Sequence, residues 1–149
     1  MTSVDTNVLL AAILPCQPLH SLARQCFESL LADGNVILAE QTLMETYGLL
    51  RNPVIQENPL TAPEAVSAIQ AIRGNPRLIV VDVPQDRSIM DETWRIAAQP
   101  GFARRRIYDV RLARTLRHWG VDTFYTRNVG DFQDAGFAKL VNPFECPSE

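Results

Sequence analysis

Four carboxylates in this chain lie where they could bind a metal ion. Asp5 ends a short apolar segment, Asp131 follows another, and Glu45 and Asp109 fall near the starts of expected helices. Carboxylates brought together raise each other's pKa, and such a cluster persists mainly when a cation neutralises it. Oxygen ligands favour Mg²⁺ or Mn²⁺ over zinc. One or two such ions can hold a phosphate, activate a water molecule and stabilise a leaving oxygen, so these acids predict metal-assisted hydrolysis.

Other catalytic chemistries have weaker support in the sequence. We find no obvious Ser–His or Cys–His pair for covalent hydrolysis. Cys16, Cys26 and Cys146 are an odd number without CxxC spacing, which argues against a disulfide framework and a structural zinc site. We expect His20 and His118 to be structural or exposed.

The order of the expected helices and strands decides where the acids lie. We expect strands at residues 3–4, 36–38, 78–83, 121–126 and 137–141, and helices at 8–14, 20–32, 41–50, 63–73, 85–98 and 107–119. This alternation predicts one α/β domain over residues 1–149, a three-layer sandwich around a mostly parallel sheet. Ligands of such sheets bind beyond the carboxyl ends of the strands, so the four acids are expected at one mouth.

Length, charge and hydropathy narrow the class of protein. The chain has 149 residues, nearly half of them apolar, which suits a single core. No apolar run reaches the roughly 18–20 residues that span a bilayer. The start does not resemble a signal peptide, because no basic segment precedes its apolar stretch, and we therefore expect a cytoplasmic protein. The formal charge of −3 lowers the expectation of nucleic-acid binding, although bound cations would reverse the local field.

Each acid also has an ordinary structural interpretation. Asp5 could cap the helix that follows it. Glu45 could belong to a capping box in which Thr42 is the N-cap. Asp109 could interact with the positive end of its helix dipole, and Asp131 could be a simple loop acid.

The segments that contain these acids resemble, in order, the motifs of PIN-domain nucleases, and in particular the VapC toxins of bacterial toxin–antitoxin pairs. The segments are VDTNVLL, ILAEQTLMETYGLLRN, IYDVRLARTLRHWGVDTFYTRN and TRNVGDF, which together span nearly the whole chain. The resemblance implies a PIN-like fold in which Asp5, Glu45 and Asp109 hold Mg²⁺ or Mn²⁺. It makes Asp131 the fourth ligand, because this chain has Asn128 where some members carry the acid.

Further residues complete the expected site. The resemblance implies that Asn7, Thr126 and Asn128 orient the acids or water. Arginines cluster beside the acidic centre at the start of the last long helix, where they could hold an RNA backbone or simply be solvated. The candidates for RNA binding are Arg104, Arg105, Arg106 and Arg111.

The resemblance implies a metal-dependent endoribonuclease that hydrolyses RNA phosphodiesters as the toxin of a toxin–antitoxin pair. It also implies a homodimer and a small antitoxin that occupies the acidic pocket. One alternative is a PIN-fold RNA-processing nuclease without a toxin role, and another is a non-catalytic module that binds RNA or protein. A phosphoaspartyl enzyme is a weaker alternative, because Thr6 and Asn7, rather than a second acid, follow Asp5.

Overall fold

The computed structural model describes residues 1–145, so Cys146 lies outside the described residues. The strands are β1 (Thr2–Val4), β2 (Val36–Ala39), β3 (Leu78–Val81), β4 (Thr123–Tyr125) and β5 (Lys139–Val141). The helices are α1 (Thr6–Ile13), α2 (His20–Asp33), α3 (Glu40–Leu50), α4 (Ala62–Arg73), α5 (Ser88–Ala97), α6 (Arg106–His118) and the short 3₁₀ helix η1 (Val129–Phe132). Within residues 1–145, no helix is both long and apolar enough to cross a bilayer.

The strands form one sheet in the order β3-β2-β1-β4-β5, and each described pairing is parallel. The chain adds β2 and β3 on one side of β1 and then crosses to add β4 and β5 on the other. Such a reversal opens a crevice at the carboxyl ends of the two strands that flank it, here β1 and β4. Val4 pairs with Tyr125, so the residues that follow them, Asp5 and Thr126, leave the sheet side by side.

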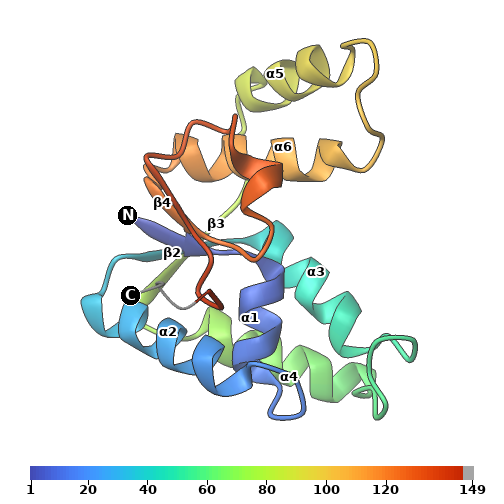
Figure 1. Ribbon diagram of the computed structural model, residues 1–149, viewed down its shortest axis with the longest axis vertical. Coiled ribbons are helices and arrows are strands. Elements are labelled where there is room, and N and C mark those ends of the chain that lie inside the picture. Colours follow the sequence, from blue (N-terminus) through green and yellow to red (C-terminus); the bar gives the residue numbers. More distant parts are fainter. Residues whose placement is uncertain (146–149) are drawn as a thin grey trace.

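Helices cover both faces of the sheet, which confirms the predicted α/β sandwich. In Figure 1, α1 to α4 lie on one side of the strands, and α5 and α6 lie on the other. Successive residues of β2 point to opposite faces. Val36 and Leu38 pack in a cluster with Leu9 of α1, while Ile37 packs in a second cluster with Leu116 of α6. Strand β2 therefore packs against both helical layers.

Five helix starts differ from the sequence prediction by one to three residues, and two of them, those of α1 and α3, concern the predicted acids. Helix α1 begins at Thr6 rather than at Val8, because the Asp5 side chain accepts the Thr6 backbone N–H at 2.8 Å as its N-cap. Helix α3 begins at Glu40, directly after β2. Thr42 therefore lies inside that helix, and the capping-box interpretation of Glu45 was wrong.

Candidate active site

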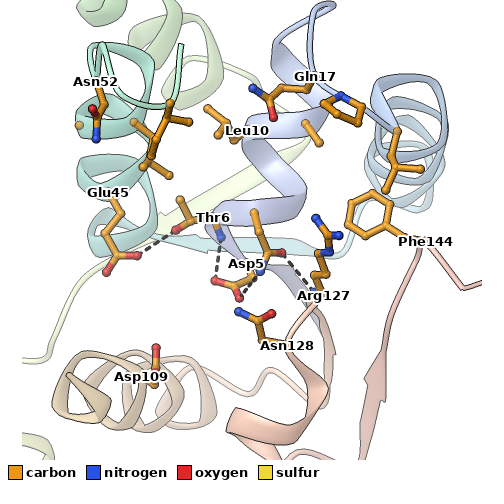
Figure 2. Close-up of a pocket in the computed structure, with 17 residues that line it drawn as sticks. Asp5, Thr6, Leu10, Gln17, Glu45, Asn52, Asp109, Arg127, Asn128 and Phe144 are labelled. Carbon is orange, nitrogen blue, oxygen red and sulfur yellow. Dashed lines mark hydrogen bonds between the residues drawn. The ribbon is translucent and has the colours of Figure 1, made fainter. Parts of the chain in front are cut away.

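A pocket of about 730 Å³ opens at the crevice beyond β1 and β4. Figure 2 shows Asp5 at the start of α1, Glu45 on α3 and Asp109 on α6 around its acidic end. Asn7 and Asn128 also line this pocket. Three of the four predicted acids are thus brought together from segments far apart in the sequence.

Both carboxylate oxygens of Asp5 accept hydrogen bonds. Oδ1 accepts the Thr6 backbone N–H at 2.8 Å, while Oδ2 accepts the Thr126 hydroxyl at 2.7 Å and the Asn7 amide at 3.1 Å. Burial raises the pKa of Asp5, these hydrogen bonds offset part of the rise, and the negative charge of Glu45 adds to it. The helix-cap and pocket interpretations of Asp5 therefore both hold, and the cap fixes the direction of the carboxylate.

Glu45 is exposed, yet neighbouring side chains orient both of its carboxylate oxygens. The Thr6 hydroxyl donates to Oε2 at 2.9 Å, and the Gln41 amide donates to Oε1 at 3.0 Å. The bond from Thr6 ties α3 to the first residue of α1. Glu45 consequently faces the pocket beside Asp5 (Figure 2).

Gln41 is a buried residue that the sequence analysis missed. Its amide nitrogen donates to Glu45 and, at 2.9 Å, to the backbone carbonyl of Tyr108. Its carbonyl oxygen accepts from Arg111 at 2.6 Å. Gln41 thus connects one acid to the helix turn that carries Asp109. The spacing of four residues between Gln41 and Glu45 was the available signal, because such residues share a helix face.

Asp109 lies in the first turn of α6 and is partly buried. Burial, followed by the negative charges of Asp5, Asp131 and Glu45, raises its pKa to about 6. The other three carboxylates thus lie close enough for their charges to act on Asp109. The neighbouring Tyr108 is 61% exposed, so the surroundings of Asp109 are not wholly apolar.

Asp131 and Asn128 lie in different hollows. Asp131 is exposed on η1 and lines a second cleft of about 300 Å³, which Asp109 also borders. Asn128 lines the first pocket, and its backbone N–H donates to the Thr126 hydroxyl at 3.0 Å. Asp109 therefore stands between the two hollows, with Asn128 on one side and Asp131 on the other.

The donor set fits a hard divalent cation. Carboxylate oxygens of Asp5, Glu45 and Asp109 face the same space. Burial, together with the neighbouring negative charges, raises the pKa of Asp5 and of Asp109, and a bound cation would favour the ionised form of both. Within residues 1–145, no three acids, histidines or cysteines are already arranged at metal-binding separations. Binding would thus require some movement, which the exposed Glu45 side chain can make.

The predicted RNA-binding arginines have different surroundings. Arg106 lies over the Phe102 ring at 5.8 Å, lines the second cleft and acts on Asp109 through its charge. Arg104 and Arg105 are exposed just before α6 and line neither hollow. Arg111 packs inward, with Gln41 at 2.6 Å and Asp82 at 3.5 Å.

The fold brings a further arginine to the acidic pocket. Arg127 follows β4 directly, and its backbone N–H donates to Oδ1 of Asn7 at 3.2 Å. Its side chain lines the pocket beside Phe144 (Figure 2). The sequence analysis did not select Arg127, although it lies between two selected residues, Thr126 and Asn128.

Solved structures with this fold include a bacterial toxin and a toxin–antitoxin complex. The fold is similar to VapC20 of Mycobacterium tuberculosis, described as a sarcin–ricin loop cleaving toxin, with a TM-score of 0.70, 23% identity and coverage of 92% of this chain and 96% of that one. It is also similar to FitAcB of Neisseria gonorrhoeae, with a TM-score of 0.62, 22% identity and coverage of 98% and 100%. A toxin–antitoxin complex of Klebsiella pneumoniae matches with a TM-score of 0.61, 17% identity and the same coverage. The fold and the acids at its crevice define a PIN-type domain.

Sequence comparison gives the family within this class. No family model matches the sequence. However, the chain is 43% identical over 143 residues to Ribonuclease VapC24 from two Mycobacterium tuberculosis strains, CDC 1551 and H37Rv, and the match covers 96% of this chain and 97% of the relative. The chain belongs to the VapC ribonuclease family, as the four sequence motifs predicted.

Proposed function

We propose that this protein is a Mg²⁺- or Mn²⁺-dependent endoribonuclease and the toxin of a toxin–antitoxin pair. The observation that carries the proposal is the meeting of Asp5, Glu45 and Asp109 at one pocket. The family adds support, because the relative at 43% identity is called a ribonuclease. A purely structural set of caps would not require three carboxylates from three helices to face one another.

The proposed roles follow from the contacts of each side chain. Asp5, Glu45 and Asp109 would hold one or two ions, and Asp131 or Asn128 would complete the set from either side of Asp109. The bound ion would supply a Lewis acid that activates water and neutralises charge developing on the phosphodiester.

The chain's own polar groups would keep this set in position. Thr126 and Asn7 orient Asp5, and Thr6 orients Glu45. Asp109 must be ionised to hold the metal ion. Hydrolysis in this family implies products with 5′-phosphate and 3′-hydroxyl ends.

The RNA backbone would follow the positive side chains near the acids. Arg106 is the best placed of the predicted arginines, because it shares a cleft with Asp109 and Asp131. Arg104 and Arg105 are exposed close by and would add long-range attraction. For Arg111 we propose a positioning role, since its guanidinium is engaged by Gln41 and Asp82.

The proposed partners are a small antitoxin and a second copy of the chain, in the cytoplasm. One structural neighbour is a toxin–antitoxin complex, which supports an antitoxin partner. An antitoxin arginine that enters the acidic pocket would replace the cation charge, which explains how such a partner could inhibit the enzyme. An RNA-processing enzyme with the same fold but no antitoxin is the second candidate. Expression of the protein separates the two, because a toxin should slow growth of the host cells and a processing enzyme should not.

The decisive experiment compares the wild type with Asp5→Asn. Mn²⁺ binding is measured by calorimetry, and RNA cleavage is measured on the same samples. We expect the wild type to bind and cleave and the near-isosteric variant to lose both. Asp33→Asn, at the exposed end of α2, is the matched control and should behave as wild type. A wild type that binds no metal, or an Asp5→Asn variant that cleaves normally, would refute the proposal.

A further inference from the structure

The pocket has two ends of different chemistry. Its acidic end carries the carboxylates described above. Its other end is lined by Leu10 and Ala11 of α1, Leu19 before α2, and Phe144 near the described C-terminal end, with Gln17 among them. Figure 2 shows Leu10, Gln17 and Phe144 of this set. Leu10 and Ala11 are buried members of the core, whereas Leu19 is exposed and Phe144 is partly buried. Metal-assisted hydrolysis of a phosphate requires only the acidic end, so the accessible Leu19 and Phe144 need a separate explanation.

The two ends are close enough for one ligand to reach both. Asp5 caps α1, and Leu10 lies five residues further along the same helix. A helix rises 1.5 Å per residue, so the apolar end begins about 8 Å from the acid. This separation suits a nucleotide whose phosphate lies at the carboxylates and whose base, or a neighbouring base, lies along α1.

Leu19 is held at the rim in a backbone conformation that leucine rarely adopts. Its φ of 68° is the only positive φ of a non-glycine residue among residues 1–145. The Leu19 side chain is 40% exposed. Neighbouring bonds hold the turn, since His20 Nδ1 lies 2.8 Å from the Ala11 carbonyl and the His20 backbone N–H donates to Gln17 at 3.2 Å. Strain of this kind often marks a residue with a functional role.

Gln17 and Arg127 add polar groups to the apolar end. The Gln17 amide nitrogen donates to Oε1 of the buried Gln56 at 3.4 Å, and its own Oε1 has no protein donor within residues 1–145. Gln17 can thus accept a hydrogen bond from a base edge. The Arg127 guanidinium forms no ion pair among the described residues and lines the same pocket.

We propose that this end of the pocket is a nucleobase-binding subsite for single-stranded or loop RNA. One unstacked base next to the scissile phosphate would lie against Leu19 and Phe144 and donate a hydrogen bond to Gln17, while Arg127 would hold an adjoining phosphate. Proteins that recognise such RNA commonly take splayed bases onto aromatic and apolar side chains. The inference rests on the proposed ribonuclease function and adds to it the side chains that would contact one base.

The test removes either the base or the rim side chain. A single-stranded oligoribonucleotide that the wild type cleaves is compared with copies that carry an abasic nucleotide at each position beside the cut. Leu19→Gly is the main variant, because glycine adopts a positive φ without strain and the turn is therefore kept. Arg127→Gln tests the phosphate contact, and Arg77→Gln, exposed ahead of β3, is its control. Thermal unfolding confirms that each variant is folded.

The expected result is a coupling between the base and Leu19. In the wild type, one abasic position lowers kcat/KM by about 10-fold, in line with measured base-stacking contributions. Leu19→Gly lowers kcat/KM of the intact RNA by a similar factor but has little effect on that abasic RNA. Arg127→Gln slows cleavage of both RNAs, and Arg77→Gln slows neither.

Two different failures can be told apart. If Leu19→Gly slows cleavage of intact and abasic RNA equally, or slows neither, the subsite proposal is overturned. The apolar end would then be a binding site for a protein segment instead. If the wild type neither binds Mn²⁺ nor cleaves RNA, the proposed function fails. Fluorescence anisotropy of the same oligonucleotides still decides the subsite in that case, because a base-binding site predicts tighter binding of intact RNA to wild type and not to Leu19→Gly.

Discussion

The Thr126 hydroxyl donates a 2.7 Å hydrogen bond to Oδ2 of Asp5 across a sequence separation of 121 residues. The bond follows from the sheet, because Val4 pairs with Tyr125 and the next residue of each strand stands beside the other. The same hydroxyl accepts the Asn128 backbone N–H at 3.0 Å. One buried side chain thus orients the first acid and shapes the loop that carries Asn128.

Thr126→Val tests this relationship, because valine has nearly the same shape and no hydroxyl. We expect the free energy of unfolding to fall by about 1–3 kcal/mol, since the buried Asp5 oxygen and the Asn128 N–H each lose a partner. The pKa of Asp5 should rise, because the Thr126 hydrogen bond lowers it in the wild type. Urea unfolding and NMR titration measure both effects. Thr126→Ser retains the hydroxyl and should retain most of the stability, and equal losses in both variants would contradict the role given to this bond.

Gln41→Ala tests whether the bridge between α3 and α6 supports the acids. The variant removes the donor to Glu45 and the contact with the Tyr108 carbonyl. Residues that orient metal ligands typically change metal affinity 10–100-fold, so we expect Mn²⁺ binding to weaken by about 10-fold or more. Calorimetry measures the affinity, with Gln25→Ala on the exposed side of α2 as control. Wild-type Mn²⁺ affinity in Gln41→Ala would show that the bridge has only a packing role.

The raised pKa of Asp109 predicts that the free energy of unfolding depends on pH when no metal is bound. Its pKa is about 6 in the folded protein and lies near 3.8 when unfolded, so the folded state holds this proton more tightly. The resulting stabilisation is complete below pH 3.8 and is lost as the pH rises through about 6.

The effect is measured in a metal chelator as the difference in unfolding free energy between wild type and Asp109→Asn. We expect the wild type to lose about 1 kcal/mol relative to the variant between pH 4 and 7, after allowance for solvent screening of a partly exposed group. Since Asp109 must be ionised to bind a cation, Mn²⁺ affinity should rise over the same range. A stability difference that does not vary with pH would rule out the raised pKa.

Arg106→Gln and Arg111→Gln should have different consequences. Arg106 lines the cleft beside Asp109, so its loss should weaken RNA binding. The slope of the logarithm of the RNA-binding constant against the logarithm of the salt concentration should fall by about one. The melting temperature of this variant should stay that of the wild type. Arg111 holds Gln41 and Asp82, so its loss should lower the melting temperature. Anisotropy at several salt concentrations and thermal unfolding measure the two effects. Identical behaviour of the two variants would refute this division of roles.

The sequence by itself determined the alternation of strands and helices and the positions of the acids at their ends. Apolar strands, proline and glycine boundaries and the segments VDTNVLL and TRNVGDF are local features, and local hydrogen bonding and side-chain period decide them. Asp5 and Asp109 could therefore be selected before any contact was known.

Only the tertiary structure decided which side chains contact these acids and which arginines lie beside them. Helix α3 starts two residues before Thr42, which excluded the capping box and left Glu45 facing the pocket. Arg111 turned inward while Arg106 remained beside Asp109. A helix start at a strand end, and the direction of a long side chain, depend on packing between elements far apart in the chain. No local pattern encodes that packing, so the contacts of Gln41 with α6 and the places of Leu19 and Arg127 in the pocket became visible only in the folded protein.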